Sequence, residues 1–425
     1  MISRIKSIFK RGEYKRIFEN MISLTGLQFA SYILPLITLP YLAFVLGPDR
    51  FGLTQYAISV VTYFQFLTDY GFNLSATREI SINKESKHVN HIFSNVMLIK
   101  LILCVISFII LTILVFGINR FTQDWFIYYL SFGLVIGYML FPTWFFQGME
   151  DMKYITIINI LGKVIFTVLI FLFVKTSGDY LLVPLFNSLG FIIVGIIGII
   201  TAIVKFNIKL VRPTLTELKY HLIEGWHVFI STIAINLYTT TNTFLLGLLT
   251  NNTLVGYYSI AEKIILAVNG LITPISQALY PFVSRLTVND KENSLIFIRK
   301  IVKIISVIGF IFSLGIFLFA EPIINLLFGT AYADSIRILK ILSFIPLIVS
   351  LSTVFGVQIM LTFNYKKAFS SILIIAGVIN VIMGTLLILS IQELGIAISF
   401  FLTELFVTVA MFLFLQRKGI KIIEK

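Results

Sequence analysis

The chain has 425 residues, of which 58% are apolar and only 12% are charged, and its net charge is +13. Soluble domains contain about 25% charged residues, so this composition excludes an ordinary water-soluble enzyme and requires lipid as the solvent for much of the surface. The basic residues fall mainly in alternate loops, which indicates membrane topology and argues against nucleic-acid binding.

Long apolar runs follow a basic N-terminal stretch that shows no cleavable signal, so the first run is expected to stay in the membrane. Runs of about twenty residues cross ~30 Å of hydrocarbon as helices. The sequence therefore predicts an all-α integral membrane protein with about twelve spans, near 22–46, 52–72, 93–117, 125–146, 154–174, 181–204, 225–249, 255–283, 300–320, 336–362, 368–390 and 395–415.

The distribution of Lys and Arg predicts the orientation of these spans. Most occur at the two ends of the chain and in the loops near 73–92, 147–153, 205–224, 284–299 and 363–367. The opposite loops contribute only Arg50, Arg120 and Lys175. Since cytoplasmic loops are rich in Lys and Arg, both termini are predicted to be cytoplasmic. The short loops leave no room for a catalytic domain, and none carries a GxxxxGK[ST] phosphate loop, so no enzymatic activity is expected.

A short pattern recurs at corresponding places in the two halves. Residues 51–57 read FGLTQYA at the start of the second span, and residues 255–261 read VGYYSIA at the start of the eighth. An even number of intervening spans predicts two halves of the same orientation, related by a pseudo-twofold axis along the membrane normal. The predicted parts are a basic cytoplasmic segment (1–20), a six-helix bundle (21–204), a cytoplasmic linker (205–224), a second six-helix bundle (225–415) and a cytoplasmic tail (416–425).

Charged residues within the spans are candidates for function, because placing one at the bilayer centre costs about 2.5–3.5 kcal/mol on insertion scales. Lys163 lies in the fifth span on one helical face with Thr156 and Asn159. Lys263 has a similar place in the eighth span. Each lysine could bind an anion in a polar cavity, or could be a structural lysine that donates to neighbouring carbonyls.

Further polar groups lie in other spans. Arg337 and Lys340 are three residues apart at the outer end of the tenth span, where they could contact substrate or extend to the membrane surface. Lys100 is expected to extend to the cytoplasmic surface. Asn236 and Thr240 add an amide and a hydroxyl to the seventh span, which suits a cavity lined from both halves.

Acidic groups are fewer than basic ones in the spans. Asp69 ends the second span and Glu404 lies in the middle of the twelfth, where a carboxylate could couple transport to an ion, act in gating or form a structural ion pair. Glu262 precedes Lys263 but lies about 100° around the helix from it, so the two charges are not expected to cancel automatically.

Metal and cofactor sites are not predicted. Cys104 is the single cysteine, which excludes an internal disulfide. His88 and His91 lie three residues apart in a polar loop without further His or Cys nearby. Positive intramembrane charge with hydroxyl and amide groups instead suits a phosphate or diphosphate that carries sugar hydroxyls.

Four segments carry a family resemblance: VLGPDRFG at 45–52, GFNLSATREI at 71–80, PTWFFQGMEDMK at 142–153 and GYYSIAEK at 256–263. Together they resemble the bacterial polysaccharide flippases of the Wzx type, in the multidrug/oligosaccharidyl-lipid/polysaccharide exporter superfamily. The resemblance covers nearly the whole chain, and it does not identify a sugar.

The resemblance implies two six-helix bundles that form a V around a central cationic cavity. Alternating access would move an undecaprenyl-diphosphate-linked oligosaccharide, of O-antigen or a similar surface polysaccharide, from the cytoplasmic to the periplasmic leaflet of the inner membrane. Lys163 and Lys263 would be the cavity charges, and Arg50 and Arg78 would serve gating or loop folding. The implied partners are this lipid-linked oligosaccharide, membrane lipid, and a polysaccharide polymerase with its chain-length regulator.

Three alternatives remain open. A multidrug antiporter of the same superfamily would be expected to have more acidic residues in its spans. A lipid II flippase often has additional helices. A membrane polysaccharide polymerase or ligase would be expected to have a large periplasmic loop, and the sequence offers none.

Overall fold

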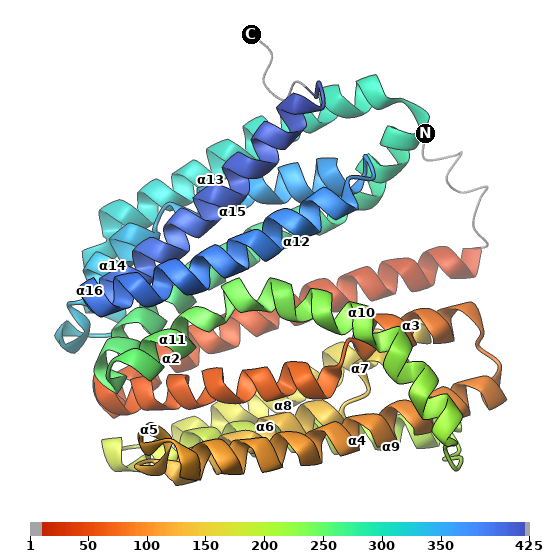
Figure 1. The fold of residues 1–425 in the computed structure, drawn as a ribbon, viewed down its shortest axis with the longest axis horizontal. Coiled ribbons are helices and arrows are strands. Elements are labelled where there is room, and N and C mark those ends of the chain that lie inside the picture. Colours follow the sequence, from red (N-terminus) through yellow and green to blue (C-terminus); the bar gives the residue numbers. More distant parts are fainter. Residues whose placement is uncertain (1–10, 421–425) are drawn as a thin grey trace. The chain divides into compact units, whose positions relative to one another are not determined.

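The structure is a computed structural model that describes residues 11–420. Within that range, the side chains of 11–33, 35–36, 227, 231–239, 272–278, 281–282, 285 and 288–289 are not described. The predicted site residue Asn236 therefore lies outside the described side chains. Every secondary-structure element in the described part of the chain is helical (Figure 1).

The helices of the first half are α2 (Arg11–Asp69), α3 (Phe72–Ile82), α4 (Ser86–Gly117), α5 (Asn119–Thr122), α6 (Trp125–Leu140), α7 (Thr143–Gly148), α8 (Lys153–Phe173) and α9 (Leu182–Phe206). A short 3-10 helix, Ser177–Leu181, precedes α9. The helix α9 lies against both α6 and α8 (Figure 1).

The helices of the second half are α10 (Leu215–Thr239), α11 (Thr241–Leu249), α12 (Asn252–Asn289), α13 (Lys291–Leu327), α14 (Ser335–Leu342), α15 (Ile345–Thr353) and α16 (Lys366–Arg417). A 3-10 turn covers Thr330–Tyr332, and a π-helix, Val354–Leu361, continues α15. The helix α10 begins inside the segment that was predicted as a linker, after the non-helical residues 207–214.

Two long helices are interrupted where the sequence predicts a loop between spans. Gly47 interrupts α2 with a φ of 71°, and Gln392 interrupts α16 with a φ of 50°. Eight helical segments among the described residues are long and apolar enough to cross a membrane, so the chain is a multi-pass membrane protein. The count of twelve, the two-bundle symmetry and the orientation of the termini stay predictions.

Contacts between residues divide the chain into two compact units. The first contains residues up to 39 together with 57–233, and the second contains 40–56 together with the residues from 234 onward. This division differs from the predicted halves in two ways. It falls within α10 and not within the 205–224 segment, and it assigns the turn between the first two predicted spans to the second unit.

Reciprocal glycine contacts explain why that turn belongs to the second unit. Gly52 faces the backbone carbonyl of Asn252, and Gly256 faces the backbone carbonyl of Pro48. Each glycine thus contacts the residue four positions before the other glycine, which is the pattern that twofold-related elements make. A methyl group at either glycine would overlap the facing carbonyl. The repeated sequence pattern therefore forms a close helix crossing.

The WFFQG segment forms part of the core of the first unit. Trp144, Phe145 and Phe146 are fully buried. The ring of Phe93 on α4 lies 5.6 Å from the Trp144 ring and 5.5 Å from the Phe145 ring. The hydroxyl of Thr77 on α3 donates to the carbonyl of Trp144 at 3.0 Å. This motif thus joins α3, α4 and α7 by packing.

Candidate functional site

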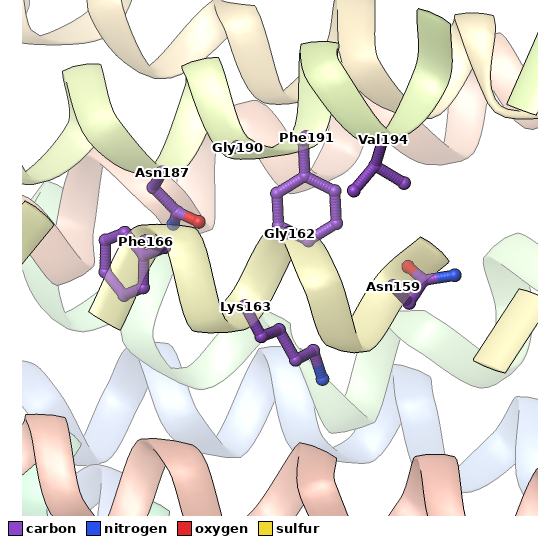
Figure 2. Close-up of a pocket in the computed structure, with 8 residues that line it drawn as sticks. All are labelled: Asn159, Gly162, Lys163, Phe166, Asn187, Gly190, Phe191 and Val194. Carbon is purple, nitrogen blue, oxygen red and sulfur yellow. The ribbon is translucent and has the colours of Figure 1, made fainter. Parts of the chain in front are cut away.

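A small pocket lies where α8 and α9 cross in the first unit (Figure 2). The helices approach closely because Gly162 faces Val194 and the carbonyl of Gly190, where a larger residue would overlap its neighbours. The pocket has a volume of about 20 Å³, which is room for about one water molecule. Its lining residues are Asn159, Gly162, Lys163, Phe166, Asn187, Gly190, Phe191 and Val194.

The predicted polar face of α8 supplies two of the groups in this pocket. Lys163 is partly buried, and Figure 2 shows its side chain extending from α8 on the side away from α9. The amide nitrogen of Asn159 donates to the carbonyl of Ile155 at 2.7 Å. The hydroxyl of Thr156, the third residue of the face, turns back to Met152 and does not line the pocket. None of the eight lining residues is acidic, so the pocket suits an anion.

A much larger cavity lies in the same unit, with a volume of about 370 Å³. This volume falls within the range of roughly 300–1,000 Å³ that ligand sites occupy. Residues at the end of α2, in the turn after it and at the start of α3 supply most of the wall, and α4 and α6 supply one residue each. The lining residues are Gln65, Phe66, Thr68, Asp69, Gly71, Asn73, Leu74, Lys100 and Tyr138.

Lys100 holds a buried ion pair at this cavity. The residue is only 2% exposed. Its ammonium lies 3.9 Å from Oδ1 of Asp69 and donates to the carbonyl of Tyr138 at 3.1 Å. The prediction that Lys100 extends to the cytoplasmic surface is therefore wrong. The lysine turns inward because a carboxylate and a carbonyl replace the hydration that the surface would have supplied.

Two other polar atoms at this cavity have no hydrogen-bond partner among the described residues. They are the hydroxyl of Thr68, a residue that is 1% exposed, and the side-chain carbonyl of Asn73. Both atoms are buried within the protein, so they lie behind the cavity wall and not on its surface. Sequence reasoning missed Lys100, Thr68 and Asn73, because the cavity draws its residues from helices that are distant in sequence.

An aromatic pair connects the two pockets. Tyr138 lines the larger pocket and Phe191 lines the smaller one. Their rings are stacked, with centroids 5.0 Å apart and planes inclined by 20°. The two pockets are therefore neighbours on one unit, on either side of this ring pair.

The second unit buries a carboxylate beside its predicted lysine. Glu262 is 8% exposed, and its Oε2 accepts a hydrogen bond of 3.1 Å from the hydroxyl of Thr243. Lys263 is partly buried and close enough to Glu262 for a favourable charge interaction. Lys263 thus faces an acid that the Lys163 pocket lacks. Sequence reasoning undervalued Glu262, since its burial depends on α11.

The remaining predicted residues have varied environments. Glu404 is buried in α16, and no described residue forms an ion pair with it. Arg337 and Lys340 are exposed on α14. Thr240 is partly buried in the step between α10 and α11.

The two predicted gating arginines lie at the surface of their elements. Arg50 is near Asp49, with Nε 4.0 Å from Oδ2, and Arg78 is exposed on α3. Neither lines one of the two pockets of the first unit.

Three of the histidines pair with acids on the predicted cytoplasmic side. His88 and His221 both lie near Glu79, at 3.7 and 3.4 Å, and His91 lies 3.0 Å from Glu217. Because His221 and Glu217 belong to α10, these contacts join the start of α10 to α3 and α4. Among the described residues, no group of three or more His, Cys, Asp or Glu side chains is arranged to hold a metal ion.

Comparison with known proteins identifies the family. Residues 17–287 match the family described as polysaccharide biosynthesis proteins. The chain belongs to this family. Two relatives are similar to this chain over nearly their whole lengths, and both are named for O-antigen transport. The protein of Escherichia coli (strain K12) is 36% identical over 93% of this chain and 96% of its own. That of Shigella dysenteriae is 26% identical over 92% of this chain and 98% of its own.

Solved structures show the same fold at low sequence identity. An inward-facing multidrug resistance transporter of the MATE family, in the MOP superfamily, has a TM-score of 0.74 at 15% identity and covers 94% of this chain and 98% of its own. The lipid II flippase MurJ in an inward closed conformation has a TM-score of 0.71 at 16% identity, over 93% of this chain and 88% of its own. This polysaccharide biosynthesis protein therefore has a transporter fold, and its relatives are named as transporters and not as enzymes.

Proposed function

We propose that this chain is a flippase for an undecaprenyl-diphosphate-linked oligosaccharide, such as an O-antigen repeat unit. It moves this substrate from the cytoplasmic to the periplasmic leaflet of the bacterial inner membrane. Two six-helix bundles give alternating access to a cationic cavity between them. Family membership, the relatives named for O-antigen transport and the fold shared with a lipid flippase support this proposal.

The observation that carries the proposal is the pocket at Lys163. Its lining includes a lysine and two amides but no acid, and the lysine side chain extends from α8 on the side away from α9 (Figure 2). A lysine within a span is costly and marks a functional site by default. A lysine binds phosphate as a point charge without strict geometry, and amides can bond phosphate or sugar oxygens.

The head group is the part of the substrate that makes crossing the membrane unfavourable. A diphosphate with sugar hydroxyls loses its hydration in hydrocarbon, which makes unaided crossing very unfavourable. Lysines, amides and hydroxyls in a cavity replace that hydration, while the polyprenyl tail remains in the bilayer. The polysaccharide polymerase and its chain-length regulator are the proposed partners that receive the translocated unit.

In this proposal each candidate residue has a role. Lys163, Asn159, Lys263, Asn236 and Thr240 line the cavity. Arg337 and Lys340 contact the head group at the outer end of the cavity. Glu404 is the candidate for ion coupling, because it is buried without an ion-pair partner among the described residues. Asp69 is a second candidate for ion coupling or gating, and Arg50 and Arg78 act in gating.

A cation antiporter is the second candidate, and one observation favours it. The second unit buries two carboxylates, Glu262 and Glu404, and buried acids suit proton or cation exchange. An ion-coupled flippase accounts for the same two acids, and it also accounts for Lys163.

Deleting the gene tests the proposal directly. We expect surface polysaccharide to disappear while single undecaprenyl-linked units accumulate on the cytoplasmic side. If single units reach the periplasmic leaflet and remain unpolymerised, the protein is a polymerase. If surface polysaccharide is unchanged while resistance to cationic compounds falls, the protein is an antiporter.

A further inference from the structure

We propose that the segment 205–219 of the first unit lies in the membrane interface and binds the anionic head groups of phospholipids in the cytoplasmic leaflet. The side chains that form this linker surface are all exposed, and they are basic residues and leucines: Lys205, Lys209, Arg212, Lys219, Leu210 and Leu215. The proposal goes beyond the transport function, because it does not depend on which substrate the protein carries.

Side chains of α4 hold the backbone of this segment. The backbone amide of Lys209 donates to Oδ1 of Asn90 at 3.0 Å, and the amide of Val211 donates to the hydroxyl of Ser94 at 2.9 Å. Asn90 and Ser94 are four residues apart, so they lie on one face of α4. The side chain of Leu210, between the two held amides, is 70% exposed. The linker surface is therefore fixed to the first unit, where α9 ends and α10 begins (Figure 1).

The acids of this region have partners inside the protein. Glu217 Oε1 lies 3.0 Å from Nδ1 of His91, and its Oε2 accepts a hydrogen bond of 2.9 Å from the hydroxyl of Thr214. Glu79 Oε2 lies 3.4 Å from Nδ1 of His221. Since Glu217 is the only acid in the segment 205–219, the charge that the linker surface presents outward is positive.

The basic residues of the linker surface are not neutralised by acids. No described residue forms an ion pair with any of the four. Lys205 instead lies over the ring of Tyr154, 4.9 Å from its centroid. Other basic residues of this unit differ, since Lys84 is 3.0 Å from a carboxylate oxygen of Glu150. The linker surface therefore has positive charge available for an anionic partner.

The two leucines show that this partner also has an apolar part. Leu215 is 86% exposed, and Leu210 is nearly as open. Both lie outside the candidate membrane spans among the described residues, one of which ends at Phe206 while the next begins at Asn252. Topology alone accounts for basic residues in a cytoplasmic loop, but it does not account for large exposed leucines among them. Leucines beside lysines and arginines are typical of segments that lie in the membrane interface.

The charge of the surface selects among lipids. The cytoplasmic leaflet of a membrane contains anionic lipids, and each Lys or Arg near its surface is attracted to them. Zwitterionic lipids carry no net charge and gain little from four cations. The linker surface therefore favours an anionic phospholipid, with the leucines at the boundary between head groups and acyl chains.

The test places a bimane fluorophore at single cysteines of the full-length protein in lipid vesicles. Cys104, the one native cysteine, is first replaced by Ala. Bromine on an acyl chain quenches a fluorophore that contacts the chain, so quenching shows which positions touch lipid. We expect strong quenching at Leu210→Cys and Leu215→Cys. The control is Thr216→Cys, at an exposed residue about 100° further around α10, where we expect weak quenching.

The second measurement concerns lipid charge. Brominated phosphatidylglycerol is compared with brominated phosphatidylcholine at the Leu210→Cys label, which gives the local enrichment of the anionic lipid. We expect an enrichment of about tenfold or more, because each Lys or Arg near the surface contributes about fivefold. Lys209→Gln with Arg212→Gln should remove most of it. The matched control is Lys366→Gln with Lys367→Gln, an exposed basic pair at the start of α16 that has no exposed leucine beside it, and it should leave the enrichment unchanged.

Three results would overturn the proposal. If neither leucine position is quenched by either lipid, these residues face water or another protein, and the interfacial position is wrong. If the two lipids quench equally in the wild-type background, the segment touches lipid without selecting its charge. If the control pair lowers the enrichment as much as the linker pair, the enrichment reflects the overall charge of the protein. The vesicles contain no lipid-linked oligosaccharide, so each result is independent of the transport function.

Discussion

The two neighbouring pockets of the first unit differ in how their residues are arranged along the chain. The Lys163 pocket is formed by two helices, α8 and α9, and its lysine and one amide lie on a single helical face. The Asp69–Lys100 cavity draws on α2, α3, α4 and α6. The first contains a charge without an acid among its lining residues, and the second contains a matched pair.

This difference shows that intramembrane lysines have different environments in one fold. Lys163 has two amides and no acid among the residues that line its pocket. Where a carboxylate and a carbonyl surround the lysine, as at Lys100, it supports a neutral polar surface. The sequence environment of the two lysines is similar, and their partners distinguish them.

The largest expected effect is the loss of transport when Lys163 is replaced. Lys163→Ala should reduce translocation of the lipid-linked repeat unit by ten- to a hundredfold, the effect of one charge-assisted contact. Lys163→Arg should retain part of the activity, because the charge remains. Recovery of surface polysaccharide in a deletion strain measures this, with the amount of protein in the membrane as control. Lys263→Ala should have a smaller effect, since Glu262 shares its environment. Normal transport by both alanine variants would contradict the cationic cavity.

The buried pair should affect stability before it affects transport. Asp69→Ala leaves the ammonium of Lys100 buried without its carboxylate, which costs about 3–5 kcal/mol. The neutral double variant, Asp69→Asn with Lys100→Gln, should recover most of this loss. Thermal unfolding of the purified protein in detergent measures both. A double variant that is no more stable than the single one would show that the pairing contributes little.

The crossing of α8 and α9 provides a test of packing beneath the small pocket. Gly162→Ala places a methyl group against Val194 and should destabilise the protein by about 1–3 kcal/mol, with a loss of transport as α8 moves. The matched control is Gly315→Ala on α13, where a methyl group meets no atom within 4 Å. That change should be neutral or stabilising by about 0.5–1 kcal/mol. Equal effects of the two substitutions would contradict a close crossing at Gly162.

The smallest expected effect is on the pH dependence of stability. It arises at the start of α10, which lies outside both pockets. The backbone amide of Thr214 bonds the Glu217 carboxylate and, with the Thr214 hydroxyl and His91, holds the pKa of Glu217 below its usual range. A lowered folded pKa stabilises the fold above the unfolded pKa of about 4.3, and this contribution is lost as pH falls through the folded pKa. The wild type should therefore be more stable than Glu217→Gln near pH 7, and the difference should shrink in acid. A difference that grows in acid would contradict the assignment.

Much of the organisation could be predicted from the sequence. Hydrophobic length predicts membrane-spanning helices, and eight helical segments among the described residues are long and apolar enough to cross a membrane. The interruptions at Gly47 and Gln392 fall between the predicted spans. Helical periodicity places Asn159 and Lys163 on one face, and both line one pocket. These successes have one cause: each property depends on residues within about one helix, where spacing alone determines which side chains are neighbours.

Properties that depend on several helices could not be predicted in this way. Lys100 was expected at the surface and lies in a buried pair, because its partners Asp69 and Tyr138 come from α2 and α6. The WFFQG motif resembles the family by sequence, yet its rings fill a core and line neither of the two pockets of the first unit. The burial of Glu262 depends on Thr243, nineteen residues earlier in the chain.

The sequence by itself determined that this protein resides in a membrane, because transfer from water to lipid depends on local composition, while the twelve spans stay predictions. The tertiary structure alone decided which of the charges in the apolar segments have partners. It placed Lys100 beside Asp69. It also joined the two repeated glycine motifs at one crossing. Pairing and cavities arise where helices distant in sequence meet, and periodicity along one helix carries no information about its neighbours.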